Sequence, residues 1–178
     1  MNPSAVIDNS SLVYLSHLHE TNFIFNYLTN LFQTIYIPAQ VVLEYQEGLI
    51  KEPHRERILN RLNPDRGFYR FCNTYDSIVL AMIKDYKGID KGEADTYAQL
   101  RKVNAHLIIS DDKSFIKAIL KLDKTTKIYT TLHLLCWLQL SYLIPDWKSM
   151  IRKVHALRPF KSNELRQAFL QVTKNLGL

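Results

Sequence analysis

Glycine, proline and cysteine are scarce in this sequence, which has 5 glycines, 6 prolines and 2 cysteines in 178 residues. So little glycine and proline argues against a disordered chain. Cys72 and Cys136 sit inside apolar segments without the spacing of a metal site. We therefore expect two free thiols that act as small hydrophobic residues in a reducing compartment, and no disulfide.

Long apolar runs are missing as well. The start, MNPSAVIDNS, has no basic region followed by an apolar stretch and so does not look like a secretory signal. The longest apolar stretch, residues 132–144, is interrupted by His133, Gln139 and Ser141. It is shorter than the roughly 20 residues of a transmembrane helix. We expect no membrane association and a cytoplasmic location.

Several motifs of known chemistry are also absent. Without a Walker loop, GxGxxG or GxSxG, the sequence gives little support to ATP, NAD or serine-hydrolase functions. The six histidines form no HExxH or HxxxH pair, and His133 is expected to be a packed, hydrogen-bonded residue. Ser10 stands two residues after Asp8, where a haloacid dehalogenase would need a second aspartate. That absence disfavours a phosphohydrolase of that type.

The composition is that of an ordinary globular protein, with 47% hydrophobic and 22% charged residues. A chain of this length fits one domain and buries roughly two thirds of the surface that its unfolded form exposes. The formal net charge is +6, and the isoelectric point is about 9.3. This bias favours a polyanionic partner without proving one.

Short apolar or β-branched runs alternate with helical patterns along the chain. The expected strands are residues 5–7, 34–37, 106–109 and 127–129, with a possible strand at 68–71. The expected helices are residues 12–18, 22–31, 38–47, 53–62, 76–86, 92–103, 113–122, 132–140, 147–155 and 162–175. Such alternation predicts crossovers between parallel strands, and hence a sheet covered on both faces.

The expected fold class is therefore α/β, a three-layer α/β/α sandwich around a central parallel sheet. Residues 1–178 are expected to form a single domain, because no repeat, low-complexity run or linker marks a second one. The α/β core would span about residues 1–130. A helical C-terminal extension over about residues 131–178 would pack on it.

Acidic residues follow or flank three of the predicted strands. Asp8 comes directly after the first strand, and Glu44 lies two turns into the helix after the second. Glu93 is in the first turn of the helix before the HLII strand, whose exit carries Asp111 and Asp112. Ligand sites in an open parallel sheet form at the carboxyl edge of the strands. We expect these acids to converge there.

Gathering carboxylates is unfavourable unless a cation joins them. Two like charges about 4 Å apart repel by roughly 4 kcal/mol at an effective dielectric of 20. Oxygen ligands without organised histidines or cysteines favour Mg²⁺ or Mn²⁺. Such an ion polarises a phosphodiester, lowers the pKa of a bound water and stabilises the leaving oxygen. Phosphodiester hydrolysis is the simplest chemistry that fits.

Four segments resemble, in the same order and at compatible separations, the four acidic motifs of PIN-domain nucleases. They are VIDNSSL (6–12), IPAQVVLEY (37–45), KGEADTYAQL (91–100) and LIISDDKSF (107–115). The GEA and DDK motifs and the tail at 132–178 are most similar to an uncharacterised branch related to the VapC toxins. The resemblance covers nearly the whole chain. It implies a Mg²⁺- or Mn²⁺-dependent endoribonuclease, the toxin of a toxin–antitoxin pair.

The resemblance also implies which residues form the site. The metal-binding acids would be Asp8, Glu44, Glu93 and one of Asp111 or Asp112, with Ser10 as the small hydroxyl beside them.

The SDDKSF run decides between the two aspartates only in part. It matches the T-x-D-x-x-F pattern of the toxins through Ser110, Asp112 and Phe115, which favours Asp112. The branch with a double aspartate leaves Asp111 open. Asn9 stands where Thr is more usual, and Glu93 where most toxins have Asp. Glycines expected near residues 130–135 are absent, which puts the turn after the last strand in doubt.

Simpler structural roles compete with the functional ones. Asp8 suits a helix N-cap, as does one of the two aspartates after the HLII strand. Glu44 could be a solvated helix residue, and Glu47 is its rival. Asp95 suits the positive end of a helix dipole, or a position outside the metal ligands.

Lysines recur every four residues on one predicted helix, at Lys113, Lys117 and Lys121. They would either contact RNA phosphates or form an ordinary solvated surface. The same choice applies to Arg55, Arg57, Arg61, Arg66 and Arg70.

The expected partners are an RNA substrate and, from the resemblance, a cognate antitoxin and a second copy of the chain in a homodimer. The alternative function is a non-catalytic RNA-binding module with a PIN-like fold. RNA versus single-stranded DNA, and one metal versus two, stay open at this level.

Overall fold

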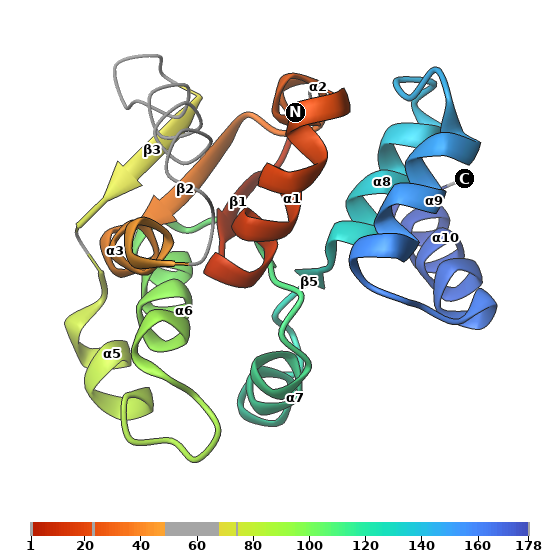
Figure 1. The fold of residues 1–178 in the computed structure, drawn as a ribbon. Coiled ribbons are helices and arrows are strands. Elements are labelled where there is room, and N and C mark those ends of the chain that lie inside the picture. Colours follow the sequence, from red (N-terminus) through yellow and green to blue (C-terminus); the bar gives the residue numbers. More distant parts are fainter. Residues whose placement is uncertain (1, 23, 49–67, 74, 178) are drawn as a thin grey trace.

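The computed structural model describes residues 2–22, 24–48, 68–73 and 75–177. Its centre is a sheet of five parallel strands in the order β3-β2-β1-β4-β5 (Figure 1). The strands are β1 (Ser4–Ile7), β2 (Thr34–Pro38), β3 (Tyr69–Cys72), β4 (Leu107–Ile109) and β5 (Ile128–Tyr129). The predicted parallel α/β sheet is confirmed.

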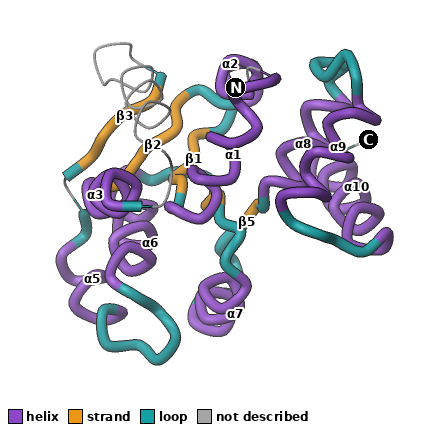
Figure 2. The backbone as a smooth tube through the Cα atoms, in the orientation of Figure 1, coloured by secondary structure: helices purple, strands orange, loops and turns teal. Residues whose placement is uncertain are grey.

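Helices connect the strands, as Figure 2 shows. They are α1 (Asn9–Asn22), α2 (Ile24–Leu31), α3 (Ala39–Glu47), α5 (Ser77–Ile83), α6 (Lys91–Val103), α7 (Lys113–Leu122), α8 (Thr131–Leu140), α9 (Trp147–Leu157) and α10 (Ser162–Leu176). The predicted helix at 53–62 lies outside the described residues.

Alternate residues of the strands point to opposite faces and build two hydrophobic cores. Ala5 and Ile7 of β1 pack in the larger core, together with buried residues of α1, α2, α3, α8 and α9. Val6 and Ile108 point to the other face, where α5, α6 and α7 supply the partners. Both faces of the sheet are therefore covered, which gives the expected three layers.

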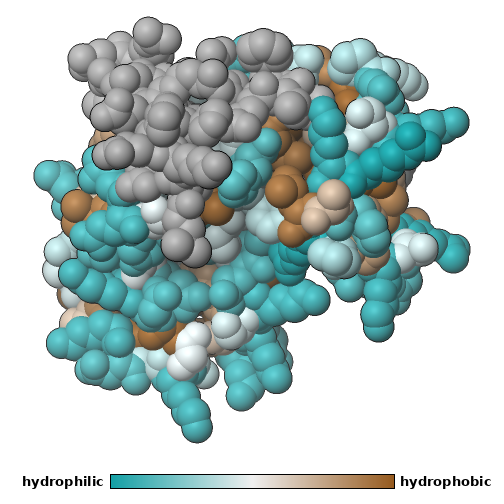
Figure 3. Space-filling model, viewed as in Figure 1, coloured by the Kyte–Doolittle hydropathy of each residue, from teal (hydrophilic) through white to brown (hydrophobic). Residues whose placement is uncertain are grey.

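The C-terminal helices continue the larger core. Buried residues of α8 and α9 pack in the same cluster as α1 and α2, and α10 lies against α8. In Figure 1 these three helices stand together beside the β5 end of the sheet. No helix in the described ranges is both long and apolar enough to cross a membrane. Hydrophilic side chains prevail on the face seen in Figure 3.

Two predicted helix starts were wrong in detail. Pro38 is the last residue of β2 and occupies the N-cap position of α3, because its ψ of 147° is extended rather than helical. Ser162 is the first residue of α10 rather than its cap. Lys161 takes the N-cap position and makes no side-chain capping bond. The possible strand at 68–71 is present and begins one residue later, at Tyr69.

Candidate active site

The candidate site lies where the direction of strand addition changes. From β1 the chain adds β2 and then β3 on one side, whereas β4 and then β5 lie on the other. The carboxyl ends of β1 and β4 are therefore neighbours at a topological switch point, the usual ligand site of such sheets. The amide of Asp8 donates a hydrogen bond of 2.9 Å to the carbonyl of Ile109, which joins the two strand ends.

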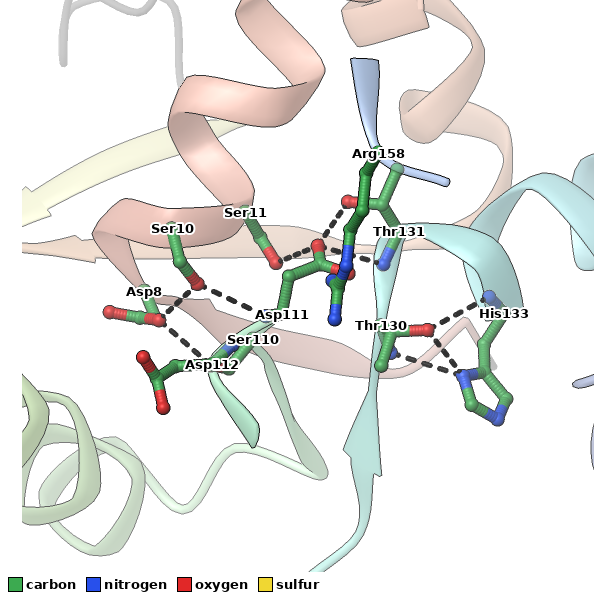
Figure 4. A network of polar contacts seen from close by, with 10 residues as sticks. All are labelled: Asp8, Ser10, Ser11, Ser110, Asp111, Asp112, Thr130, Thr131, His133 and Arg158. Atoms are coloured by element: carbon green, nitrogen blue, oxygen red, sulfur yellow. Dashed lines mark hydrogen bonds and ion pairs between the residues drawn. The ribbon is translucent and has the colours of Figure 1, made fainter. Parts of the chain in front are cut away.

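Asp8 is buried at this junction, with a relative exposure of 4%. Its Oδ2 accepts hydrogen bonds from Ser10 Oγ at 2.6 Å and Ser110 Oγ at 2.7 Å (Figure 4). Burial raises the pKa of the Asp8 carboxyl, and the two serine hydroxyls oppose that rise only in part. Among the described residues Asp8 has no lysine or arginine in an ion pair. A buried carboxylate without a counter-ion is unfavourable unless a cation reaches it.

Asp111 and Asp112 point in different directions (Figure 4). Asp111 Oδ1 forms an ion pair with Nη1 of Arg158 at 2.8 Å. Its Oδ2 accepts hydrogen bonds from Ser11 Oγ at 2.7 Å and from the amide of Thr131 at 3.1 Å, and also from the Thr131 hydroxyl. These donors come from α1, α8 and the end of α9. Asp111 therefore ties the C-terminal helices to the sheet.

Asp112 is the N-cap of α7. Its Oδ1 accepts from the amides of Ser114 at 2.7 Å and Phe115 at 3.0 Å. Burial by itself would raise the pKa of Asp112, but the bonds from Ser114 and Phe115 together hold it below its usual value. The capping bonds all fall on Oδ1. The other oxygen is the one that a cation could take.

Ser110 connects Asp112 to Asp8. The amide of Asp112 donates to Ser110 Oγ at 3.2 Å, and that hydroxyl in turn donates to Asp8. Ser10 makes a similar link, because its Oγ accepts from the amide of Asp111 at 3.0 Å. The two serines thus fix the turn after β4 against the first residues of α1. Ser110 entered the sequence analysis only as part of a motif, and this bridging role was missed.

Glu93 and Asp90 form a capping box at the start of α6. The amide of Glu93 donates to Asp90 Oδ1 at 2.8 Å, and the amide of Asp90 donates to Glu93 Oε2 at 2.9 Å. Burial is the main cause that raises the pKa of Glu93 to about 7. The negative charges of Asp90, Asp112 and Asp8 raise it further, in that order. Glu93 therefore lies within electrostatic reach of the strand-end acids.

Asp90 is an acid of this cluster that the sequence analysis overlooked. Its charge acts on Asp8, Glu44 and Glu93. The signal was present in the run DKGE, because Asp followed three residues later by Glu is an N-terminal capping pattern.

Glu44 lies against the start of α6. A Cβ on Gly92 would stand 2.7 Å from Glu44 Oε2 and 2.8 Å from its Cδ, so a side chain at position 92 would force the Glu44 carboxylate to move. Burial raises the pKa of Glu44, Gln40 lowers it, and the charges of Asp90 and Asp8 raise it. Its rival Glu47 is exposed at the end of α3. The structure therefore gives Glu44, rather than Glu47, the position near Asp8.

The remaining charged candidates lie around this cluster. Asp95 is buried on α6; burial raises its pKa and Lys91 opposes the rise. Lys113, Lys117 and Lys121 are exposed on α7. Arg70 is exposed on β3. Residues 55, 57, 61 and 66 lie outside the described ranges.

The acids fit a hard divalent cation in their chemistry. They offer carboxylate oxygens, and within the described ranges only Asp111 of the strand-end acids has a basic counter-ion. As the side chains stand, no three acids, histidines or cysteines in that part of the chain are close enough together to form a metal site. Like-charge repulsion keeps the carboxylates apart in the absence of a cation, so the side chains would have to turn inward around a bound ion.

Comparison with protein-family models gives a match over nearly the whole chain. The family model DUF3368, described as a PIN domain, matches residues 4–175. The match spans every strand of the sheet and all of the acids discussed above. A search of curated proteins finds no match.

Proposed function

The chain belongs to the PIN-domain family DUF3368, and from this premise we propose that it is a Mg²⁺- or Mn²⁺-dependent endoribonuclease. PIN domains are generally nucleases and generally use divalent metal ions. The proposal adds the substrate, RNA, and the reaction, hydrolysis of a phosphodiester bond. The net charge of +6 supports a polyanionic substrate.

One observation carries the proposal: Asp8 is buried at the switch point and has no basic counter-ion in the described chain, whereas its neighbour Asp111 has Arg158. A stabilising network would pair both carboxylates. The unpaired one lies within electrostatic reach of Glu44 and Glu93. This is the arrangement expected of carboxylates that bind a cation.

The residues of this chain would divide the work as follows. Asp8, Glu44, Glu93 and Asp112 would hold the ion, while Ser10 and Ser110 keep Asp8 Oδ2 in place and leave Oδ1 for binding. When bound, Mg²⁺ or Mn²⁺ supplies Lewis-acid polarisation of the phosphate and a water of lowered pKa. Asp111 would position Asp112 through the adjacent backbone instead of binding the ion itself.

Lysines of α7 extend from the site. Lys113 follows Asp112 directly, and Lys117 and Lys121 continue along the exposed face of the same helix. Side chains four residues apart lie on one face of a helix. We propose that this stripe contacts phosphates on one side of the scissile bond.

The biological role that we propose is that of a toxin in a toxin–antitoxin pair, on the resemblance of the GEA and DDK segments to the VapC-related branch. A cognate antitoxin would block the site by placing a basic side chain among the acids, and the chain would work as a homodimer. We place the activity in the cytoplasm. Cys72 and Cys136 are free thiols, the state that a reducing compartment maintains.

The test is cleavage of a mixed RNA pool with added Mn²⁺. Wild type should cleave, and both Asp8→Asn and chelation should abolish cleavage. Asp146→Asn is the matched control, because Asp146 is an exposed N-cap of α9 and asparagine caps about as well. Cleavage that survives both Asp8→Asn and the chelator would exclude the metal mechanism.

The spacing of the acids favours one alternative, an RNA-binding module without turnover. Within the described ranges the acids stand too far apart to form a metal site without rearrangement. Folded protein that binds RNA through α7 but cleaves neither RNA nor single-stranded DNA with any added Mg²⁺ or Mn²⁺ would establish this function instead.

A further inference from the structure

A cavity lies on the other side of Asp111 from Asp8. It has a volume of about 220 Å³, is partly open to solvent, and is bordered by α7, α8, α10 and the segment after α9. Its apolar wall includes Ile116, Leu132 and Phe160, and its polar wall includes His133, Gln167 and Gln171. Pockets for drug-sized molecules measure about 300–1,000 Å³. This cavity therefore suits one small ring system.

The charges around the cavity cancel. Arg158 is paired with Asp111 at 2.8 Å, and the remaining charged residues of its lining are Lys113 and Glu164, one of each sign. His133 adds no charge: its Nδ1 accepts from the amide of Thr130 at 3.2 Å, and burial lowers its pKa. A ligand for this cavity is thus neutral and carries hydrogen-bonding groups.

A nucleobase has these properties. The side chain of Arg158 is 31% exposed, and its guanidinium lies 6.0 Å from the ring centre of Tyr14. Because both residues line the cavity, a planar guanidinium group borders it. Bases of single-stranded RNA stack on aromatic rings and guanidinium planes. The amide groups of Gln167 and Gln171 offer both donors and acceptors to a base edge.

The buried hydroxyl of Tyr14 is a further sign of an incomplete site. Tyr14 lines the cavity, and its hydroxyl is buried without a hydrogen-bond partner among the described residues. Buried polar groups are nearly always paired in native proteins. A polar ligand, or a small shift of Arg158 when one binds, would supply the missing partner.

The cavity also stands beside the acids. Asp111 lines it, while the side chain of the next residue, Asp112, lies on the side of Asp8 in Figure 4. Lys113 both lines the cavity and begins the lysine stripe of α7. A nucleotide held in the cavity would therefore be adjacent to the nucleotide whose phosphodiester bond lies at Asp8 and Asp112.

We propose that this cavity, lined by Tyr14, Lys113, His133, Arg158, Gln167 and Gln171, binds one unpaired base of the RNA next to the scissile phosphodiester. The proposal rests on the proposed nuclease function for its place in the reaction, but base binding itself needs neither metal nor cleavage. A base must leave its stack to enter such a cavity. The substrate is accordingly single-stranded or looped RNA, with a base preference at one position beside the cut.

The first experiment measures binding without cleavage. Each of the four nucleoside monophosphates is titrated into metal-free wild-type protein in chelator, and ribose 5-phosphate serves as the ligand that lacks a base. At least one monophosphate should bind at millimolar concentration, and ribose 5-phosphate should bind much more weakly. Equal binding of ribose 5-phosphate, or no binding of any monophosphate, would overturn the proposal.

Two tryptophan variants of α10 locate the bound base. Gln167 is exposed at the surface but lines the cavity, so Gln167→Trp is placed to fill it without disturbing the core. Asn163→Trp is the matched control, an exposed amide on the same helix outside the lining. Gln167→Trp should raise the Kd at least about tenfold, a loss of roughly 1.4 kcal/mol. The control should bind like wild type, and equal Kd values for both variants would overturn the proposal.

Sequencing of the cleavage products separates the two ideas. Gln167→Trp should still cleave, with a weakened base preference beside the cut. If wild type binds monophosphates in the cavity but never cleaves, the nuclease function fails and the base site stands. If wild type cleaves and Gln167→Trp leaves its base preference unchanged, the base site fails and the nuclease function stands.

Discussion

The carboxylate of Glu44 rests on the backbone of Gly92, with Oε2 2.7 Å from the place where a Cβ would stand. Two helices that follow different strands thus meet at a residue with no side chain. Gly92 has no left-handed φ, since among the described residues only Gly88 and Gly177 are glycines with positive φ. The glycine is needed for space rather than for backbone conformation.

Gly92→Ala should therefore disable the site without unfolding the protein. The new methyl group displaces the Glu44 carboxylate, and a misplacement of about 1 Å can cost up to a hundredfold in kcat/KM. The free energy of unfolding should change by no more than about 1 kcal/mol, because alanine is the better helix residue. Cleavage assays and urea denaturation measure the two effects.

The double variant Glu44→Ala/Gly92→Ala is the control for that prediction. It removes the clash together with the carboxylate, so its activity should match that of Glu44→Ala alone. Additive losses in the double variant would show that Gly92 acts by some other route.

Asp111→Asn should lower stability, whereas Asp112→Asn should lower cleavage activity. Asp111→Asn removes the partner of Arg158 and should lower the free energy of unfolding by about 1–3 kcal/mol. Asp112→Asn keeps the α7 cap, because asparagine caps helices as well as aspartate does, and should leave stability nearly unchanged. Its loss should fall on cleavage. If Asp111→Asn is stable but inactive and Asp112→Asn is active, Asp111 rather than Asp112 would be the residue that binds the ion.

The stability of metal-free protein should fall as the pH rises from about 4.5 to about 7. The pKa of Glu93 is raised from 4.5 to about 7 by burial, so in this range the folded protein binds a proton that the unfolded chain has lost. The stabilisation is complete below the unfolded value and is lost as the pH passes the folded one. The effect is on the order of 1 kcal/mol.

Glu93→Gln tests that assignment. Glutamine preserves the capping box with Asp90 but cannot ionise. The free energy of unfolding, measured by urea denaturation in chelator between pH 4 and pH 8, should vary less with pH for this variant than for wild type. Parallel curves would place the titration on another group.

Divalent cations should stabilise the folded protein without any RNA. At about a hundredfold excess over Kd, Mn²⁺ would add roughly 2.7 kcal/mol to the free energy of unfolding. Thermal denaturation should show a higher Tm for wild type and for Asp146→Asn, and little change for Asp8→Asn. An equal rise of Tm in Asp8→Asn would place the ion elsewhere.

The lysines of α7 should account for part of the salt dependence of RNA binding. Each phosphate neutralised on single-stranded RNA contributes about −0.7 to the slope of log K against log salt. Replacing Lys113, Lys117 and Lys121 by glutamine should make that slope shallower by up to about 2. A slope that stays the same would mean that α7 is an ordinary solvated surface.

The fold was predictable because its strands are short, apolar and separated by helices. Residues 107–109 read as LII, too apolar for a solvated strand, and a strand buried on both faces belongs in a parallel sheet. Helix ends were less certain, as Pro38 and Ser162 show. Alternative starts of a helix that differ by one residue have similar free energies, so the sequence does not fix the first helical residue.

The sequence indicated which acids lie near this edge of the sheet, but not the directions of their side chains. Strand ends placed Asp8 and the pair at 111 and 112 on one edge, since parallel strands share that edge. Asp111 forms an ion pair with Arg158, which is remote in sequence and follows α9. No local pattern contains that information. Asp90, by contrast, was visible as a capping residue and was overlooked.

The ion pair of Asp111 and Arg158 joins residues 47 positions apart, which sets an order of events during translation. A nascent polypeptide that has emerged only through α8 carries Asp8, Glu44, Glu93 and Asp112, yet its Asp111 has no cation beside it. The ion pair at Asp111 forms only when residue 158 has left the ribosome. Until then the hydrogen bonds from Ser11 and Thr131 hold Asp111 without a counter-charge.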